Sequence, residues 1–221
     1  MEIFESADIP EPRHQHPDFE RIESREVGDE VEAQREGDVI GHPDQLADYW
    51  QRQQGPNECA IAAQGMIVEA SGRSYDRDAV IANEQANGSY DLDTGTRGDD
   101  IGHVLESQGI PVDQDGGFDN PVGRDEAWSR LADDVSGGKG VIVGLDARPI
   151  WSQDSNLESS NVEGHAVWVT GLEHDGAAIT GVMCNDSGRE DGQAIRYDAA
   201  LFDKAWSRFG YLNVSTRNPI I

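Results

Sequence analysis

Four side chains of this sequence could together carry out nucleophilic chemistry at a carbonyl carbon: Cys59, His165, Asp186 and Gln53. Cys59 falls in the first turn of a predicted helix, where the helix dipole and unpaired backbone N–H groups lower the pKa of a thiol. The resulting thiolate is a nucleophile, provided that a base lies within hydrogen-bond distance and a further group orients that base. The alternative interpretation is that Cys59 is a small buried apolar side chain, as lone cysteines usually are.

His165 and Asp186 are predicted to be the base and its orienting carboxylate. His165 opens the apolar stretch 165–171, which is an unusual place for a polar side chain. If residues 175–176 form a two-residue turn between antiparallel strands, His165 lies directly opposite Asp186, with the Cβ atoms roughly 4.5–5.5 Å apart. Taken singly, the histidine could belong to the core and the aspartate to a turn. Their shared register favours a Cys-His-Asp triad.

Gln53 is predicted to help stabilise the oxyanion that forms when a thiolate attacks a carbonyl. It stands six residues before Cys59, and its side-chain amide and the Cys59 backbone N–H could supply two donors. Gln54 is the neighbouring candidate for this role, and either glutamine could simply be a polar loop residue. In the same way, Asn185 is the alternative to Asp186 as the partner of the histidine, although the expected register points it to the opposite face.

These side chains would be held by N-terminal helices packed on a mostly antiparallel sheet. Helices are expected at residues 59–70, 74–84, 97–108, 124–135 and 198–208, and strands at 110–112, 140–146, 164–174, 177–186, 194–197 and 211–216. Asn57 and Thr96 are expected to cap the first and third of these helices through their side-chain oxygens. Residues 148–163 are expected to form a polar loop that holds Trp151. This order of elements predicts an α+β fold.

The composition indicates one domain preceded by an arm. The chain has 221 residues, which suits a domain of about 150 to 180 residues and a tail. Residues 1–44 contain several prolines and an acidic run with little apolar periodicity, so they are predicted to form a flexible acidic arm. A short helix over 30–36 is the only element expected in that arm. Residues 45–217 are predicted to form the globular domain.

The charge of the chain argues against several classes of partner. Asp and Glu number 43 against 17 Lys and Arg, for a formal net charge of −26. Such a surface is strongly solvated and disfavours binding to nucleic acid or to an anionic membrane. Only two lysines occur, so the acidic surface also fits a salt-adapted protein. Because there is no secretory leader and no apolar run of about 18 residues, we expect a cytoplasmic protein, or one exported without a leader.

The other candidate nucleophiles and metal ligands lack the companions that chemistry requires. Cys184 lies two residues before Asp186, opposite Val167 in the expected register, and is predicted to be a packed core thiol. Two cysteines in a chain of this length do not make a disulfide framework. His14 and His16, in the arm, have no neighbouring ligands. Neither a metal nor another cofactor is therefore expected.

These residues resemble the peptidase C39-like domains of the papain-like cysteine peptidase superfamily. The resemblance covers roughly residues 44–216, and Ala60 and Ser187 stand where many members have glycine and proline. The features that carry it are Gln53 six residues before Cys59, the helix 59–70, Gly95-Thr96, the strand 165–171 opened by His165, Asn185-Asp186, and the closing helix around 202–206 with the strand that follows.

The resemblance implies a papain-like fold and a thiol hydrolase that cleaves peptide or amide bonds in a peptide or protein substrate. By that resemblance Cys59 is the nucleophile, His165 the base, Asp186 its orienting group and Gln53 the oxyanion-hole residue. One alternative is a side-chain deamidase or transamidase on the same scaffold, which the products would distinguish. Another is a catalytically silent binding module, which a sulfur far from the histidine ring would favour.

Overall fold

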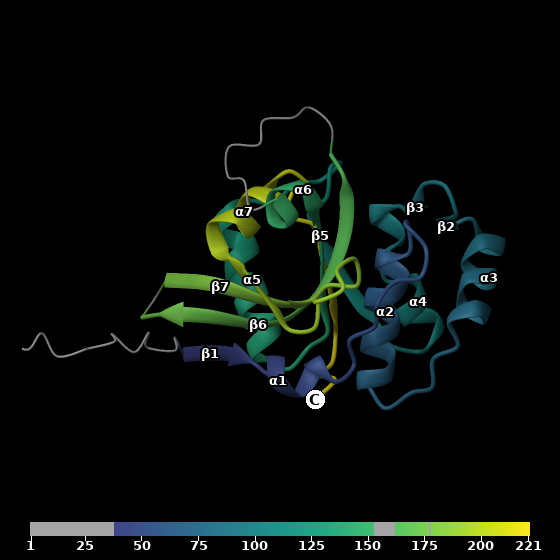
Figure 1. Cartoon of the computed structure of the whole chain (residues 1–221), viewed down its shortest axis with the longest axis horizontal. Helices are drawn as coiled ribbons and strands as arrows, with labels where there is room; N and C mark the ends of the chain where they lie inside the picture. Colours follow the sequence, from purple (N-terminus) through teal and green to yellow (C-terminus); the bar gives the residue numbers. More distant parts are fainter. Residues whose placement is uncertain (1–37, 153–161, 177) are drawn as a thin grey trace, which may run out of the picture. The chain divides into compact units, whose positions relative to one another are not determined.

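A seven-stranded sheet organises the chain, with helices on both of its faces (Figure 1). The computed structural model describes residues 38–152, 162–176 and 178–221. Their strands are β1 (Asp38–Gly41), β2 (Tyr90–Asp91), β3 (Gly95–Thr96), β4 (Val112–Asp115), β5 (Val141–Asp146), β6 (Gly164–Asp175), β7 (Ala178–Asn185), β8 (Ile195–Asp198) and β9 (Asn213–Thr216). Their helices are α1 (Pro43–Ala47), α2 (Cys59–Ala70), α3 (Arg77–Asn87), the 3₁₀ turn η1 (Gly98–Asp100), α4 (His103–Ser107), α5 (Arg124–Ser136), α6 (Ala147–Ser152) and α7 (Ala199–Ser207).

Every pairing in the described sheet is antiparallel. The strands follow the order β4-β9-β5-β6-β7-β8, and β1 adds to β6. β6 is the central strand, because it pairs with β5, with β7 and, over its second half, with β1. The predicted α+β fold is confirmed. None of the described helices is long and apolar enough to cross a membrane.

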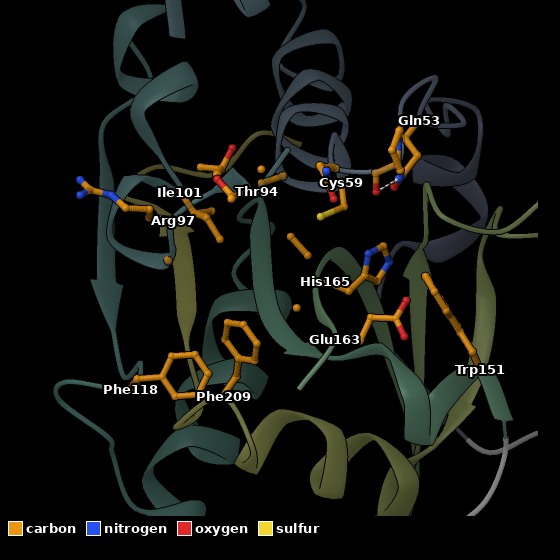
Figure 2. Close-up of a pocket in the computed structure, with 18 residues that line it drawn as sticks. Gln53, Cys59, Thr94, Arg97, Ile101, Phe118, Trp151, Glu163, His165 and Phe209 are labelled. Atoms are coloured by element: carbon orange, nitrogen blue, oxygen red, sulfur yellow. Dashed lines mark hydrogen bonds between the residues drawn. The ribbon is translucent and has the colours of Figure 1, made fainter. Parts of the chain in front are cut away.

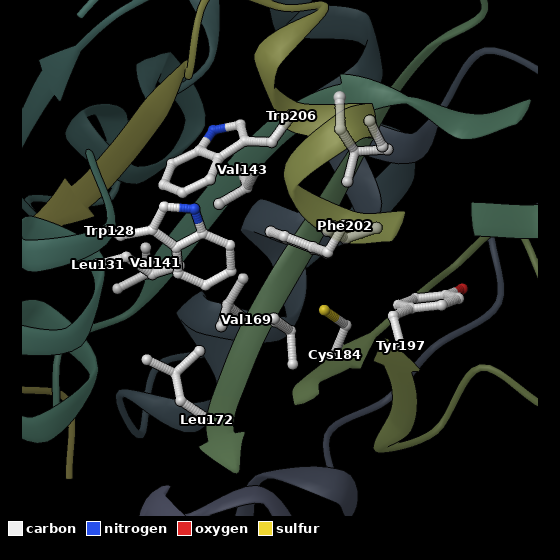
Figure 3. Packing of buried hydrophobic residues seen from close by; sticks show 14 of the residues in the cluster. Trp128, Leu131, Val141, Val143, Val169, Leu172, Cys184, Tyr197, Phe202 and Trp206 are labelled. Atoms are coloured by element: carbon white, nitrogen blue, oxygen red, sulfur yellow. The ribbon is translucent and has the colours of Figure 1, made fainter. Parts of the chain in front are cut away.

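Alternate residues of β5 face two different hydrophobic cores. Val141 and Val143 pack against α5 and α7. On those helices Trp128 and Trp206 meet edge to face, with ring centroids 5.6 Å apart (Figure 3). Ile142, between the two valines, packs instead in the cluster formed by α2. Successive side chains of a strand point to opposite faces, so burial on both faces explains why this strand is an unbroken apolar run.

The helix α2 is buried around almost its whole circumference, since nine of its twelve residues are buried. Gly65 lets Tyr75 approach closely, because a Cβ at that position would lie 2.4 Å from the tyrosine ring. The buried Gln64 accepts hydrogen bonds through Oε1 from the backbone N–H groups of Gly102 and Val104, at 2.9 and 3.1 Å. These bonds join α2 to the start of α4 and hold the helix in place beside the sheet.

Two predicted helix caps are wrong. The residue before α2 is Glu58, and Asn57 instead donates through Nδ2 to the carbonyl oxygens of residues 92–93, both at 2.9 Å. Thr96 belongs to the short strand β3. The helix expected to follow it is interrupted at Gly102, whose φ of 118° no residue of a right-handed helix adopts. Tertiary contacts of the loop before β3 therefore override the local capping preferences.

Trp151 lies on the helix α6, and this corrects the loop expected over 148–163. Asp146, at the end of β5, accepts hydrogen bonds through Oδ1 from the Arg148 backbone N–H and through Oδ2 from the Arg148 guanidinium, at 3.3 and 2.7 Å. A carboxylate that accepts from the first turn stabilises a helix N-terminus. The remainder of the expected loop, residues 153–161, lies outside the described residues.

The register expected for the β6–β7 hairpin is also wrong. Asp175 pairs with Ala178, and the register shifts twice, between Val169 and Gly171 and between Glu173 and His174. Each shift corresponds to a bulge, in which one strand contributes an extra residue. As a result Cys184 faces Val169 rather than Val167, and Asp186 lies just beyond the end of β7.

Part of the expected acidic arm belongs to the sheet. Residues 1–37, which include the helix expected over 30–36, lie outside the described residues. Asp38–Gly41 form β1, whose backbone pairs with residues 171–174 of β6, and α1 begins at Pro43. The hydrogen bonds of an edge strand hold this acidic segment, although its side chains are mostly exposed.

Candidate active site

A cleft of about 400 Å³ is lined by three of the four predicted residues, Gln53, Cys59 and His165, and Asp186 lies buried behind the histidine (Figure 2). Cys59, the first residue of α2, lines one wall, and its thiol is half-buried. His165, the second residue of β6, lines the wall across from it. Its position is set by β5, because Leu145 is its pairing partner in the sheet. A helix N-terminus thus faces the start of a central strand.

His165 lies between its two predicted partners. Its Nε2 lies 2.7 Å from Asp186 Oδ1, so Nδ1 is the ring nitrogen left for the Cys59 thiol, which lines the same cleft and whose pKa the histidine lowers. The imidazole is also shielded by Trp151, whose ring centroid lies 4.9 Å away. At 5% exposure, His165 has little freedom to leave this position. The arrangement is the one that a nucleophile, its base and an orienting group require.

The Asp186 carboxylate is fully buried and accepts four hydrogen bonds. Its Oδ1 accepts from His165 Nε2 at 2.7 Å and from the Gly188 backbone N–H at 2.8 Å. Its Oδ2 accepts from Trp151 Nε1 at 3.0 Å and from the Tyr197 hydroxyl at 2.6 Å. A buried charge is costly unless it is paired and hydrogen-bonded, and here both oxygens are satisfied.

The electrostatics favour a thiolate beside an imidazolium. Burial by itself raises the pKa of Cys59, but the hydrogen bond and the charge of His165 outweigh burial, so that the pKa is lowered. Burial by itself lowers the pKa of His165, whereas Asp186 and Cys59 raise it to about 10. Burial likewise raises the pKa of Asp186, but its hydrogen bond to His165 and the histidine's charge hold it well below its usual range. Each group therefore stabilises the charged form of its neighbour.

Gln53 lines the same cleft and is held by Ser187. The Gln53 backbone N–H donates to the Ser187 carbonyl oxygen at 2.9 Å, and the Ser187 hydroxyl donates to Gln53 Oε1 at 3.1 Å. These bonds leave Nε2 as the donor end of the side chain. Nε2 donates to the carbonyl oxygens of Gly55 and Pro56, at 2.9 and 3.0 Å. Donation to an oxyanion would therefore exchange one of these two bonds.

The alternative residues do not occupy the site. Asn185 points away from the histidine, donating to the Leu46 carbonyl at 2.8 Å and accepting from the Ala194 N–H at 3.0 Å. Gln54 does not line the cleft, and its backbone N–H donates to Glu58. Cys184 is fully buried in the core, where burial raises the pKa of its thiol.

Asp186 reaches His165 by a route other than the predicted strand register. The residue pairs in β6 and β7 do not place it opposite His165, because two bulges shift the register. The carboxylate reaches the imidazole from the turn after β7 instead. Its backbone there is fixed by a hydrogen bond from the Asp186 N–H to the Gly192 carbonyl, at 2.8 Å, and by Trp50 Nε1, which donates to the Asp186 carbonyl at 2.8 Å.

Two contributors to the site, Tyr197 and Ser187, were not found from the sequence, and Trp151 was weighed only as a side chain of a substrate groove or of the core. A buried tyrosine hydroxyl usually has a hydrogen-bond partner, so Tyr197 on the predicted strand 194–197 was a candidate for the carboxylate of Asp186. Trp151 was expected in a loop, where neither a helical nor a strand periodicity predicts which way the side chain points. No sequence pattern indicates that a serine hydroxyl reaches a glutamine 134 residues away.

A charged pair, Glu58 and Arg77, lies next to Cys59. Glu58 is buried and binds the Arg77 guanidinium at 2.5 and 3.1 Å, and it also accepts from the backbone N–H of Gln54 at 3.2 Å. An unpaired carboxylate next to Cys59 would raise the pKa of the thiol. Arg77 compensates that charge while the carboxylate holds the loop before α2.

Within residues 38–152, 162–176 and 178–221, no three His, Cys, Asp or Glu side chains are placed to hold a metal ion.

The comparisons with known proteins agree with this architecture. The sequence model of the Peptidase_C39 like family matches residues 44–214. A protein from Bacillus anthracis described as a C39-like peptidase is 14% identical, with a TM-score of 0.55, and the match covers 81% of this chain and 97% of that chain. The peptidase domain of Streptococcus ComA, described as a bifunctional ABC transporter of a quorum-sensing pathway, is 12% identical, with a TM-score of 0.49 and coverage of 76% and 96%. No curated protein sequence matches the chain.

Proposed function

This chain belongs to the Peptidase_C39 like family, and from that membership we propose that it is a cysteine peptidase with Cys59, His165 and Asp186 as its triad. The observation that carries the proposal is that one imidazole, 2.7 Å from the buried Asp186 carboxylate, shares a cleft with the Cys59 thiol and lowers its pKa. The same arrangement supports an enzyme over a catalytically silent binding module, because a module without chemistry needs no thiol beside an imidazole.

The reaction begins with attack of the Cys59 thiolate on the carbonyl carbon of a peptide bond. The thiolate forms the new C–S bond, and the negative charge moves to the carbonyl oxygen. Donors aimed at that oxygen stabilise it most where water is excluded. The Cys59 backbone N–H, at the N-terminus of α2, and the Gln53 amide are the donors that this cleft offers.

His165 moves the proton in both halves of the reaction. As imidazolium it donates a proton to the leaving nitrogen when the C–N bond breaks, which leaves an acyl group on the Cys59 sulfur as a thioester. As neutral imidazole it then takes a proton from water, whose oxygen attacks the thioester and releases the thiol. Asp186 holds Nε2, so that Nδ1 faces the sulfur throughout.

Alkylation of the thiol tests the proposal directly. Iodoacetamide is expected to modify Cys59 rapidly near neutral pH, because the thiol is half-buried at the cleft and its pKa is lowered. Cys184 is an internal control, because it is fully buried and its pKa is raised. Peptide mapping should find the label on Cys59 in wild type and lose it in Cys59→Ala. Equal modification of both cysteines, or faster modification of Cys184, would contradict the assignment.

The products identify the reaction. Incubation of a peptide mixture with wild type should give new peptide ends, and Cys59→Ala should give none. A side-chain deamidase would instead leave the backbone intact and convert Gln or Asn amides to carboxylates. Mass spectrometry of the same samples separates the two outcomes.

A further inference from the structure

The cleft extends beyond the triad into a part that the chemistry does not use. Away from the triad it runs past Ile101 to Arg97, Phe118 and Phe209 (Figure 2). Arg97 and the two phenylalanines also line an adjoining hollow of about 310 Å³, whose wall includes Leu212. The two adjoining hollows therefore offer a substrate more surface than the scissile bond alone would occupy.

An aromatic pair forms the surface of this extension. The rings of Phe118 and Phe209 lie in contact, with centroids 4.4 Å apart and an interplanar angle of 46°. Phe118 is nevertheless 61% exposed. Exposed aromatic surface is unfavourable in water, and an apolar side chain laid on it removes that surface from the solvent. The geometry therefore points to an apolar group of the ligand.

Two other exposed apolar side chains are close in the sequence to residues that line the cleft. Leu92, which is 60% exposed, lies two residues before Thr94 of the cleft wall, and Val162, which is 39% exposed, precedes Glu163 of the wall. Together with Phe118 they are three of the five large apolar side chains exposed among the described residues.

The charge at the far end of the cleft is negative. Asp99 and Asp119 line the adjoining hollow and are exposed, and neither forms an ion pair with any described residue. Arg97, the cation of this wall, is already bound to Asp100 at 2.7 Å. The net charge of −26 adds a long-range repulsion of acidic ligands. Complementarity therefore favours a basic group close to the apolar one.

We propose that Phe118 and Phe209 form a subsite for a large apolar side chain of a peptide substrate, and that Asp99 and Asp119 select a basic residue beside it. This proposal rests on the proposed peptidase function and names the sequence class that the enzyme prefers. The occupant is an extended, apolar and basic polypeptide segment.

Binding to Cys59→Ala, which is expected to bind peptides without cleaving them, tests the subsite. The probes are blocked peptides of equal length, Gly-Gly-Phe-Lys-Gly-Gly and its matched forms with Ser in place of Phe and with Glu in place of Lys, measured by isothermal titration calorimetry. The Phe-Lys peptide should bind most tightly. Phe118→Ala should weaken it about tenfold, as expected for the loss of an aromatic contact at a binding site, and leave the Ser-Lys peptide unchanged.

Matched variants test whether the change in peptide affinity is due to the Phe118 ring and the two aspartates. Val39→Ala removes an exposed apolar side chain of β1 and should bind all peptides as the parent does. Phe118→Leu keeps an apolar surface and should retain most of the affinity. Asp99→Asn combined with Asp119→Asn should reduce the preference for Lys over Glu to the part that the net charge of the chain causes. Equal binding of the Phe and Ser peptides, or an unchanged affinity in Phe118→Ala, would overturn the subsite.

The test separates this proposal from the proposed function. Rapid alkylation of Cys59 in wild type, together with equal binding of all peptides, overturns the subsite and leaves the peptidase. Selective binding of the Phe-Lys peptide without a reactive Cys59 overturns the peptidase and leaves a peptide-binding cleft. If Cys59 is reactive and the Phe-Lys peptide binds selectively, sequencing of the wild-type cleavage products should show Phe or Leu next to Lys or Arg at a constant distance from the cut.

Discussion

At the scale of single residues, the most constrained group of the site is the Asp186 carboxylate. Both of its oxygens are saturated, by the histidine and a backbone N–H on one side and by an indole and a phenol on the other. A carboxylate so held cannot rotate without losing several bonds in a buried environment, where unsatisfied polar groups are costly. It therefore fixes both the position and the tautomer of His165.

Asp186→Asn should change the pH dependence of the enzyme. The pKa of His165 is about 10 in wild type, raised in part by the carboxylate, so the imidazolium is lost only as the pH passes that value. An amide removes the negative charge, and the pKa of His165 falls. The alkaline limit of peptide cleavage should move to lower pH, and kcat should fall roughly 10²–10⁴-fold, as expected when a general acid–base group is misoriented.

The measurement is the rate of cleavage between about pH 5 and about pH 11, with both variants followed on one peptide substrate. Asp191→Asn is the matched control, since Asp191 lies near Asp186 in the sequence but is exposed and pairs with Arg189. That variant should keep the wild-type profile. An unchanged alkaline limit in Asp186→Asn would show that the carboxylate does not act on the imidazole.

At the scale of elements, the site is assembled where several elements end. The N-terminus of α2 supplies the thiol, the start of β6 the imidazole and the turn after β7 the carboxylate. Asp146, at the end of β5, binds Arg148 and Arg208 and accepts from the Glu163 backbone N–H at 3.2 Å. This buried network joins α6, the segment after α7 and the start of β6. It holds the side of the cleft that carries the histidine.

The turn after β7 also serves the opposite side of the cleft, because Ser187 follows Asp186 directly and binds Gln53. Ser187→Ala removes the hydroxyl that orients the glutamine amide. We expect kcat to fall by up to about tenfold, less than the roughly 10²–10³-fold loss expected for Gln53→Ala, with KM nearly unchanged. Because alkylation by iodoacetamide forms no oxyanion, its rate at Cys59 should stay as in wild type.

The double variant distinguishes positioning from a structural effect. If the serine acts through the glutamine, combining Ser187→Ala with Gln53→Ala should cost little more than Gln53→Ala alone. Ser136→Ala is a control, since its hydroxyl only donates to a carbonyl at the end of α5. Additive losses, or a slower alkylation of Cys59, would mean that Ser187 supports the loop in general.

At the scale of the whole molecule, the net charge of −26 is the dominant feature. Like charges repel one another across the folded surface, and salt screens them over a Debye length that falls from about 10 Å at 0.1 M to about 3 Å at 1 M. Potassium chloride should therefore raise Tm in thermal unfolding followed by circular dichroism. Exposed ion pairs such as Arg52–Glu190 are weakened by the same salt, but such pairs contribute little to the free energy of unfolding.

The control is to repeat the measurement of Tm against potassium chloride concentration at a pH close to the isoelectric point of about 4.3. There the carboxylates are partly protonated and the net repulsion is small, so the salt dependence of Tm should largely disappear. A Tm that falls with salt near neutral pH would indicate that ion pairs outweigh the repulsion.

Much of the local structure could be predicted from the sequence, because it depends on neighbours along the chain. The helix over 59–70 is found as α2, and the apolar run 140–146 contains the strand β5. The α+β class and the resemblance to the family are confirmed as well. Cys59, His165 and Asp186 were selected as a group from residue types and spacing; in the structure Cys59 and His165 line one cleft, and Asp186 is hydrogen-bonded to the histidine.

Only the tertiary structure decided how these residues meet. The two bulges in the β6–β7 hairpin depend on how both strands pack against other elements, so the register counted from the turn was wrong although the selected residues do meet. The Ser187 hydroxyl binds a glutamine 134 residues away, and the Tyr197 hydroxyl reaches Asp186 from the neighbouring strand β8. The chemistry of the nucleophile is local, since a cysteine at a helix N-terminus is visible in one segment. The environment that makes it reactive is built by contacts between segments, and these follow from packing.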